Sequence, residues 1–179
     1  MTTEFKAWPK TPRPKHNKIT ITEKMDGTNA CVVIEDGQVV AVQSRNRFIK
    51  VGDDNFGFAS WVHSNADALA RLGNGHHFGE WVGPGIQRNP HKLEQKEFFL
   101  FNTARSYQYL PDVVKQVPVL YHGVASDAAI YLAYTKLWAR AANDKYSPEG
   151  IIVLYHVTDT RVKYTFANQD GKNIRTCMI

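Results

Sequence analysis

The residues with the clearest chemical potential surround Lys24, which follows a β-type run over residues 19–22. Gly27, three residues after the lysine, allows a tight turn beside it. A lysine amine has an ordinary pKa of about 10.4, and it becomes a nucleophile when neighbouring cations lower that value. Polar residues flank the lysine on both sides, namely Glu23, Asp26 and Asn29. Lys24 is therefore placed to act on a molecule held in a cleft.

Two carboxylates occupy positions for which the bare sequence leaves two interpretations open. Glu80 lies inside an otherwise apolar strand predicted over residues 77–82. Because burying an unpaired charge is costly, Glu80 needs a partner, which is either an arginine or a ribose hydroxyl. Glu149 lies at the mouth of a strand predicted over residues 149–155. Its carboxylate is either a solvated turn residue or a ligand of Mg²⁺.

Two pairs of cations are spaced so that both members point to one side of a strand. Arg45 and Arg47 end a strand predicted over residues 38–44, and Arg161 and Lys163 lie in one predicted over residues 161–166. Residues two apart in a strand share a face, so each pair could grip phosphate. A charged strand end can equally be solvated.

The elements that must position these residues form an α+β pattern. Asp36-Gly37 predicts a hairpin turn between two strands, and helices are predicted over about 54–72 and 127–144. We expect largely antiparallel sheets flanked by the helices. Residues 103–126 give no clear pattern. The predicted strands cover residues 19–24, 29–35, 38–44, 77–82, 97–102, 149–155 and 161–166, and the first helix is expected to bury Phe58, Trp61, Val62, Leu69 and Leu72.

Composition is consistent with one globular domain spanning residues 1–179. The chain has 43% apolar and 22% charged residues. No apolar run reaches the length of a membrane span and no signal peptide is evident, so we expect a cytosolic protein, in the host cytoplasm if it is viral. A net charge of +5 favours a polyanionic partner. Residues 1–18 form a proline-rich basic arm in which Lys15 and Lys18 are candidates to contact nucleic-acid phosphates.

The stretch Thr22-Glu23-Lys24-x-x-Gly27-Thr28-Asn29 resembles the lysine motif of the covalent nucleotidyltransferases, which include DNA ligases, RNA ligases and capping enzymes. Its form is most similar to the RNA ligase 2 branch, because DNA ligases and capping enzymes usually have arginine at the position of Asn29. Five further motifs of that family have counterparts here in the same order, at residues 44–47, 79–83, 97–101, 149–153 and 161–163.

The resemblance implies a role for each matched residue. Lys24 would be the nucleophile, and Lys163 and Arg161 would neutralise phosphate charge, although the family usually has lysine at the position of Arg161. Glu149 would assist Mg²⁺ or Mn²⁺. Phe101 would stack on the purine, although asparagine follows it where the family has aspartate. The remaining nucleotide contacts would come from Glu23, Asn29, Arg45 and Glu80, and Arg47 would join the lysines of the arm in contacting nucleic-acid phosphates.

The resemblance further implies an ATP-grasp-like nucleotidyltransferase domain with the nucleotide between two sheets, acting as an ATP-dependent RNA ligase. AMP would pass from ATP to Lys24, then to an RNA 5′-phosphate, and a 3′-hydroxyl would displace it. A DNA ligase, a capping-type guanylyltransferase and an inert nucleic-acid-binding relative are the alternatives. Only residues 167–179 follow the last motif, too few for the oligonucleotide-binding or helical domain that ligases usually append. Binding of the RNA substrate is then expected to depend on the basic surface, the arm or a partner protein.

Overall fold

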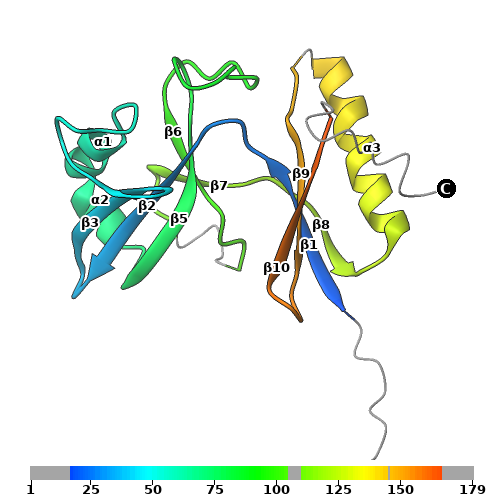
Figure 1. Cartoon of the computed structure of the whole chain (residues 1–179), viewed down its shortest axis with the longest axis horizontal. Helices are drawn as coiled ribbons and strands as arrows, with labels where there is room; N and C mark the ends of the chain where they lie inside the picture. Colours follow the sequence, from blue (N-terminus) through cyan, green and yellow to red (C-terminus); the bar gives the residue numbers. More distant parts are fainter. Residues whose placement is uncertain (1–16, 105–109, 145, 167–179) are drawn as a thin grey trace, which may run out of the picture.

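The computed structural model describes residues 17–104, 110–144 and 146–166, which form two β-sheets and three helices (Figure 1). The predicted basic arm therefore lies almost wholly outside the described residues. In chain order the elements are β1 (Lys18–Lys24), β2 (Thr28–Glu35), β3 (Gln38–Ser44), β4 (Phe48–Ile49), α1 (Phe58–Ser64), α2 (Ala66–Ala70), β5 (Gly75–Val82), β6 (Glu97–Leu100), β7 (Val114–Gln116), β8 (Val119–Val124), α3 (Asp127–Asp144), β9 (Gly150–Tyr155) and β10 (Thr160–Thr165).

The larger sheet has six strands in the order β4-β3-β2-β5-β6-β7. All neighbours are antiparallel except β6 and β7, which run parallel. The predicted Asp36-Gly37 hairpin joins β2 to β3, and both turn residues have positive φ, 49° and 71°. The smaller sheet has four antiparallel strands in the order β10-β9-β1-β8. The predicted α+β class with largely antiparallel sheets is confirmed.

Each sheet has one face covered by helix, and the helices lie on the outer flanks with the two sheets between them (Figure 1). On the smaller sheet, Ile19, Ile21, Ile151 and Val153 pack with residues of α3, among them Leu137. Because side chains alternate along a strand, the even-numbered residues of β1 and β9 lie on the opposite, uncovered face. This uncovered face of the smaller sheet carries Lys24.

The core of the larger sheet lies under α1 and α2. Phe58, Val62, Leu69 and Leu72 are buried there as predicted, and Trp61 packs against this cluster while partly exposed. Strand residues of the same cluster include Trp81, Phe98 and Leu100. The alternating residues of β2, β5 and β6, such as Asn29, Glu80 and Phe99, consequently lie on the uncovered face of the larger sheet.

The joint between the sheets is short. β1 of the smaller sheet connects to β2 of the larger sheet through residues 25–27, and β7 connects back to β8 through residues 117–118. A third apolar cluster holds these two connections together, and it consists of Met25, Val82, Phe99 and Val117 with Leu93 packed against it. Lys24 therefore lies at the joint, as the last residue of β1.

The helix predicted over about 54–72 is wrong in its extent, because it is two short helices. Its first turn starts later, and the Asp54 carboxylate accepts hydrogen bonds from the backbone N–H groups of Ala59 (2.7 Å) and Ser60 (3.1 Å). At Asn65 the backbone leaves helical geometry, with φ −122° and ψ 18°, and the second helix begins. Nothing in the apolar pattern marked that break.

Residues 103–126 contain two strands that the sequence did not predict, β7 and β8. β7 has only three residues, and its backbone pairs with a distant strand, β6. β6 itself ends at Leu100, so Phe101 follows the strand instead of lying within it, although its N–H still donates to the carbonyl of Phe78 (3.0 Å). Of the helices in the described part of the chain, none combines the length and apolarity that crossing a bilayer requires.

Candidate active site

Lys24 and Glu149 meet at the joint between the sheets. Lys24 pairs in register with Gly150 of β9, so the preceding residue, Glu149, lies beside the lysine. Lys24 Nζ donates a hydrogen bond to Glu149 Oε2 at 2.5 Å. The two side chains are 22% and 19% exposed. Glu149 is therefore not a freely solvated turn residue, because it is held against the candidate nucleophile.

Glu80, Asn29 and Arg45 form a second group on the larger sheet, called the Glu80 group below. Asn29 pairs in register with Glu80, and its Nδ2 donates to Glu80 Oε2 at 2.8 Å. Arg45 Nε donates to the amide oxygen of Asn29 at 2.7 Å. The sequence left open whether Glu80 pairs with an arginine. Asn29 instead stands between them, because an amide both donates and accepts.

Burial raises the pKa of Glu80 to about 7 from its ordinary value of 4.5. The positive charge of Lys24, the hydrogen bond from Asn29 and the charge of Arg45 oppose this rise, whereas the negative charge of Glu149 adds to it. Electrostatic interactions thus join residues of both sheets into one site. A carboxylate with this pKa changes its charge near neutral pH and accepts hydrogen bonds most strongly when ionised.

We expect Glu80→Gln to change how stability depends on pH. The folded protein holds the Glu80 proton more tightly than the unfolded chain, so ionisation costs stability as pH rises from about 4.5 to 7. Relative to wild type, Glu80→Gln should gain about 3 kcal/mol in unfolding free energy between pH 4.5 and pH 8. Urea unfolding at both pH values measures this. Exposed Glu94 supplies the control, Glu94→Gln, and an equal shift in both variants would contradict the prediction.

Phe101 lies on the uncovered side of the larger sheet, two residues after Phe99, and its side chain is 41% exposed. An exposed aromatic ring at this position has a free face available for a flat ligand. The following residue, Asn102, uses its side-chain oxygen to accept a hydrogen bond from the N–H of Ala104 at 3.0 Å. The asparagine that departs from the family pattern therefore stabilises a local turn.

Lys163 and Arg161 lie on the same uncovered face as Lys24, at different distances from it. Lys163 is in register with Ile152, which is in register with Thr22, two residues before Lys24. Arg161 is in register with Leu154, which is in register with Thr20, four residues before Lys24. Both cations are exposed. The structure thus places Lys163 nearer to Lys24 than Arg161.

The side chain of Glu23 is directed away from this group. It is fully buried on the α3 side of the smaller sheet, where Oε2 lies 3.0 Å from Arg140 Nη2 and Oε1 lies 3.1 Å from His91 Nε2. This follows from strand alternation, because Glu23 and Lys24 are consecutive and face opposite sides. A contact between the Glu23 carboxylate and a nucleotide beside Lys24 is not compatible with this position.

The predicted phosphate contacts are also not gathered around Lys24. Arg47 forms two hydrogen bonds with Asp53, at 2.7 and 2.9 Å, and lowers the pKa of that carboxyl. Lys18 begins β1, six residues or about 20 Å of strand from Lys24. Lys15 lies outside the described residues.

One contact of the lysine motif was not predicted from the sequence: Asp26 pairs with an arginine from the segment after β5. Arg88 Nε lies 2.9 Å from Oδ2 of Asp26, whose side chain is only 12% exposed. The signal was present, because a carboxylate in a motif that enters the core needs a partner. The identity of the partner, 62 residues away, could not be read from local spacing.

Gly27 has a different role from the turn predicted for it. Its φ is not in the left-handed region, and a Cβ there would collide with the Trp81 carbonyl oxygen and lie 2.9 Å from both Glu80 Cγ and Val82 Cγ2. The glycine therefore allows the lysine motif to approach β5 closely. This approach sets the distance between Lys24 and the Glu80 group.

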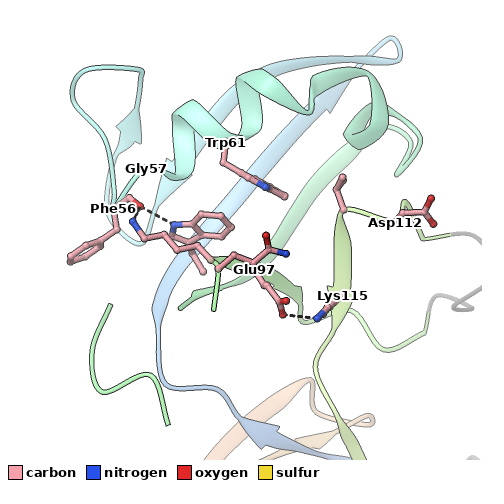
Figure 2. Close-up of a pocket in the computed structure, with 10 residues that line it drawn as sticks. Phe56, Gly57, Trp61, Glu97, Asp112 and Lys115 are labelled. Atoms are coloured by element: carbon pink, nitrogen blue, oxygen red, sulfur yellow. Dashed lines mark hydrogen bonds and ion pairs between the residues drawn. The ribbon is translucent and has the colours of Figure 1, made fainter. Parts of the chain in front are cut away.

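A cavity of about 550 Å³ lies apart from these residues, beside α1, β6 and the edge strand β7 (Figure 2). Its charged groups are largely paired, since Lys115 Nζ lies 2.7 Å from Glu97 Oε2 and Lys96 donates to the carbonyl of Phe56 at 2.8 Å. Its lining contains no member of the Lys24 group. We therefore place the candidate active site at Lys24 and Glu149, together with the Glu80 group, and not at this cavity.

The described residues contain no cluster of three or more histidine, cysteine, aspartate or glutamate side chains that could hold a metal ion by itself. Lys24 contacts Oε2 of Glu149, so Oε1 is the oxygen not used in this hydrogen bond. Mg²⁺ commonly binds through one or two carboxylates together with substrate phosphates. The donor set at Lys24 fits that mode of binding.

The chain belongs to the RNA ligase family, whose sequence profile matches residues 17–165. Its two-sheet α+β architecture is the nucleotidyltransferase fold of that family. A comparison with curated proteins finds no match.

Solved structures of Naegleria gruberi RNA ligase share this fold. A lysine-to-alanine variant with ATP and Mn matches with a TM-score of 0.61 and 20% identity, over 83% of this chain and 49% of that chain. A lysine-to-methionine variant with AMP and Mn gives 0.61 and 21%, over 84% and 50%. The ligase with PPi gives 0.57 and 20%, over 84% and 50%. This chain therefore spans about half the length of the solved structures it matches.

Proposed function

We propose that this domain is the adenylylating unit of an ATP-dependent RNA ligase. The observation that carries the proposal is the Lys24–Glu149 contact, 2.5 Å long, at a joint that also brings in Glu80 and Asn29. A lysine held by a carboxylate, beside buried polar groups and an exposed aromatic ring, suits nucleophilic attack on a bound nucleotide. Membership of the RNA ligase family supports the same reaction.

In the first step, the neutral Lys24 amine attacks the α-phosphorus of ATP. The N–P bond forms as the bond to the β-phosphate oxygen breaks, so pyrophosphate leaves and a lysyl–AMP phosphoramidate remains. Glu149 orients the amine and accepts a proton from it. Lys163 stabilises the charge on the departing phosphates, with Arg161 one row behind it.

The Glu80 group and Phe101 hold the nucleotide during this step. Ionised Glu80 accepts hydrogen bonds from the ribose hydroxyls, and Asn29 and Arg45 keep its carboxylate in place. Phe101, which is 41% exposed, stacks on the adenine. Glu149 would hold Mg²⁺ or Mn²⁺ through Oε1, and such an ion neutralises phosphate charge when bound. The ATP and Mn in the related Naegleria structures support this choice of ligands.

The later steps complete strand joining. The AMP moves from Lys24 to an RNA 5′-phosphate, forming a P–O–P bond as the N–P bond breaks. A 3′-hydroxyl then attacks the RNA phosphate, and AMP leaves. A capping-type guanylyltransferase and a DNA ligase share the first step, so the identity of the nucleotide and of the acceptor distinguishes them.

The test is to incubate the protein with Mg²⁺ and either ATP or GTP labelled at the α-phosphorus, and then to run a denaturing gel. We expect covalent label from ATP and not from GTP. Addition of nicked duplexes with a 5′-phosphate should release the label, and faster for RNA ends than for DNA ends. Label from GTP would favour a guanylyltransferase. Binding of RNA without label from either nucleotide would refute the proposal and leave a binding module.

A further inference from the structure

Two histidines on the uncovered face of the smaller sheet enclose a buried threonine hydroxyl. Thr20 is 3% exposed, and its Oγ1 lies 2.8 Å from His122 Nδ1 on β8 and 2.8 Å from His156 Nε2 after β9. The ring centroids are 5.5 Å apart. Both histidines are exposed, and within the described part of the chain their outer nitrogens contact no other group. The pair has no place in the adenylylation step described above.

The surroundings of this pair are strongly cationic. Lys18 lies two residues from Thr20 on the same face of β1, and Arg161 lies in the same cross-strand row as Thr20. Lys163 occupies the next row. A carboxylate beside this surface, that of the exposed turn residue Asp159, lies 3.3 Å from Arg161. Across the joint, His76 and Glu80 lie on the face of β5 that looks toward this sheet. Such a surface attracts an anion and repels a metal cation.

The threonine hydroxyl links the protonation of the two rings. A hydroxyl has one proton, so it donates to one imidazole nitrogen and accepts from the other ring. With both rings neutral, only one outer nitrogen then carries a proton. When both rings are protonated, both outer nitrogens become charged donors. Protonation of the pair therefore adds both hydrogen-bond donors and positive charge on its outer side.

We infer that His122 and His156, with Lys18 and Arg161, bind backbone phosphates of the RNA substrate. This inference rests on the proposed function and extends it to the path of the strand. Thr20 is four residues, or about 13 Å of strand, from Lys24, so the pair lies beyond the row of Lys163 that faces the phosphates of ATP. A nucleic acid engaged at Lys24 runs along β1 and is held there by charge without reading sequence.

The test uses the full chain and a 5′-phosphorylated, dye-labelled single-stranded RNA of about 20 nucleotides, without ATP, followed by fluorescence anisotropy. The variants are the double substitution His122→Gln with His156→Gln and the double substitution His122→Lys with His156→Lys. His63→Gln on α1 is the control. Glutamine keeps a hydrogen bond to Thr20 without charge, and lysine restores charge without titrating in this range. Because Glu80 also titrates near pH 7, each variant is compared with wild type at the same pH.

At pH 6 the glutamine variant should bind RNA about five- to tenfold more weakly than wild type, with a salt slope reduced by at most about 1.4, the value for two full charges. The difference should shrink at pH 8, and the lysine variant should bind at least as tightly as wild type at both pH values. Lysyl–AMP formation without RNA should be unchanged. Unchanged RNA affinity in the glutamine variant overturns the inference, as does a raised ATP requirement, which would assign the pair to the triphosphate. Failure of wild type to form lysyl–AMP would refute the proposed function separately.

Discussion

Replacing Lys24 with alanine is expected to abolish covalent labelling by ATP, with a loss of at least about 1,000-fold. The reason is that the Nζ atom, held 2.5 Å from Glu149 at the joint of the sheets, is the only group proposed to form the phosphoramidate bond. Lys24→Arg should lose labelling to the same extent, because a guanidinium keeps its proton and cannot act as a nucleophile. Denaturing gels with ATP labelled at the α-phosphorus measure both variants.

The arginine variant also separates chemistry from folding. It retains a cation beside Glu149, so its melting temperature should stay close to that of wild type. Lys136→Ala, at an exposed position on α3, should label normally and serves as the matched control. Residual labelling of Lys24→Ala at more than a tenth of the wild-type rate would mean that another residue is the nucleophile.

Gly27→Ala should have the second-largest effect, on both stability and labelling. The added Cβ would collide with the carbonyl oxygen of Trp81 and crowd Glu80 and Val82, so either the backbone or β5 must move. Overpacking of this kind costs about 1–3 kcal/mol. Displacement of Lys24 from the Glu80 group by even about 1 Å should reduce labelling about 100-fold. Thermal unfolding and single-turnover labelling test the two effects together.

A second glycine provides the comparison for Gly27. Gly37 lies in the β2–β3 hairpin with φ 71° and no atom within 4 Å of an added Cβ. Asparagine tolerates that backbone conformation, so Gly37→Asn should cost little and should leave labelling intact. If Gly27→Ala resembled Gly37→Asn in both measurements, the close approach of the lysine motif to β5 would not control the site.

Prediction from the sequence worked where structure is local and periodic. The strands predicted over 19–24, 29–35 and 38–44, the Asp36-Gly37 turn and the helix predicted over 127–144 all depend on residues close together in the chain. Prediction failed for β7 and β8, because β7 forms only by parallel pairing with β6 and has three residues. Such a strand is stabilised by its neighbour more than by its own sequence.

The site shows the same division. The motif order led us to group Lys24, Asn29, Glu80 and Glu149; in the structure Lys24 contacts Glu149, and Asn29 contacts Glu80 in direct register. The interpretation of Glu23 followed its adjacency to Lys24, although consecutive strand residues face opposite sides. Its burial against Arg140, 117 residues away, depends on how α3 packs, and no spacing within the chain encodes that contact.

Because the site is divided between two sheets joined by two short connections, its geometry depends on how the sheets are oriented to each other. Lys24 ends a strand of the smaller sheet and Glu149 precedes another, whereas Asn29 and Glu80 lie in strands of the larger sheet and Phe101 follows one. Within the described chain, only residues 25–27 and 117–118 connect the two sheets. In the proposed reaction, the distance from Lys24 to the bound nucleotide would therefore depend on the angle between the two sheets. The apolar cluster of Met25, Val82, Phe99 and Val117 packs the two sheets together at these connections. None of these four side chains belongs to the proposed nucleotide contacts, yet they pack at the connections between the two sheets.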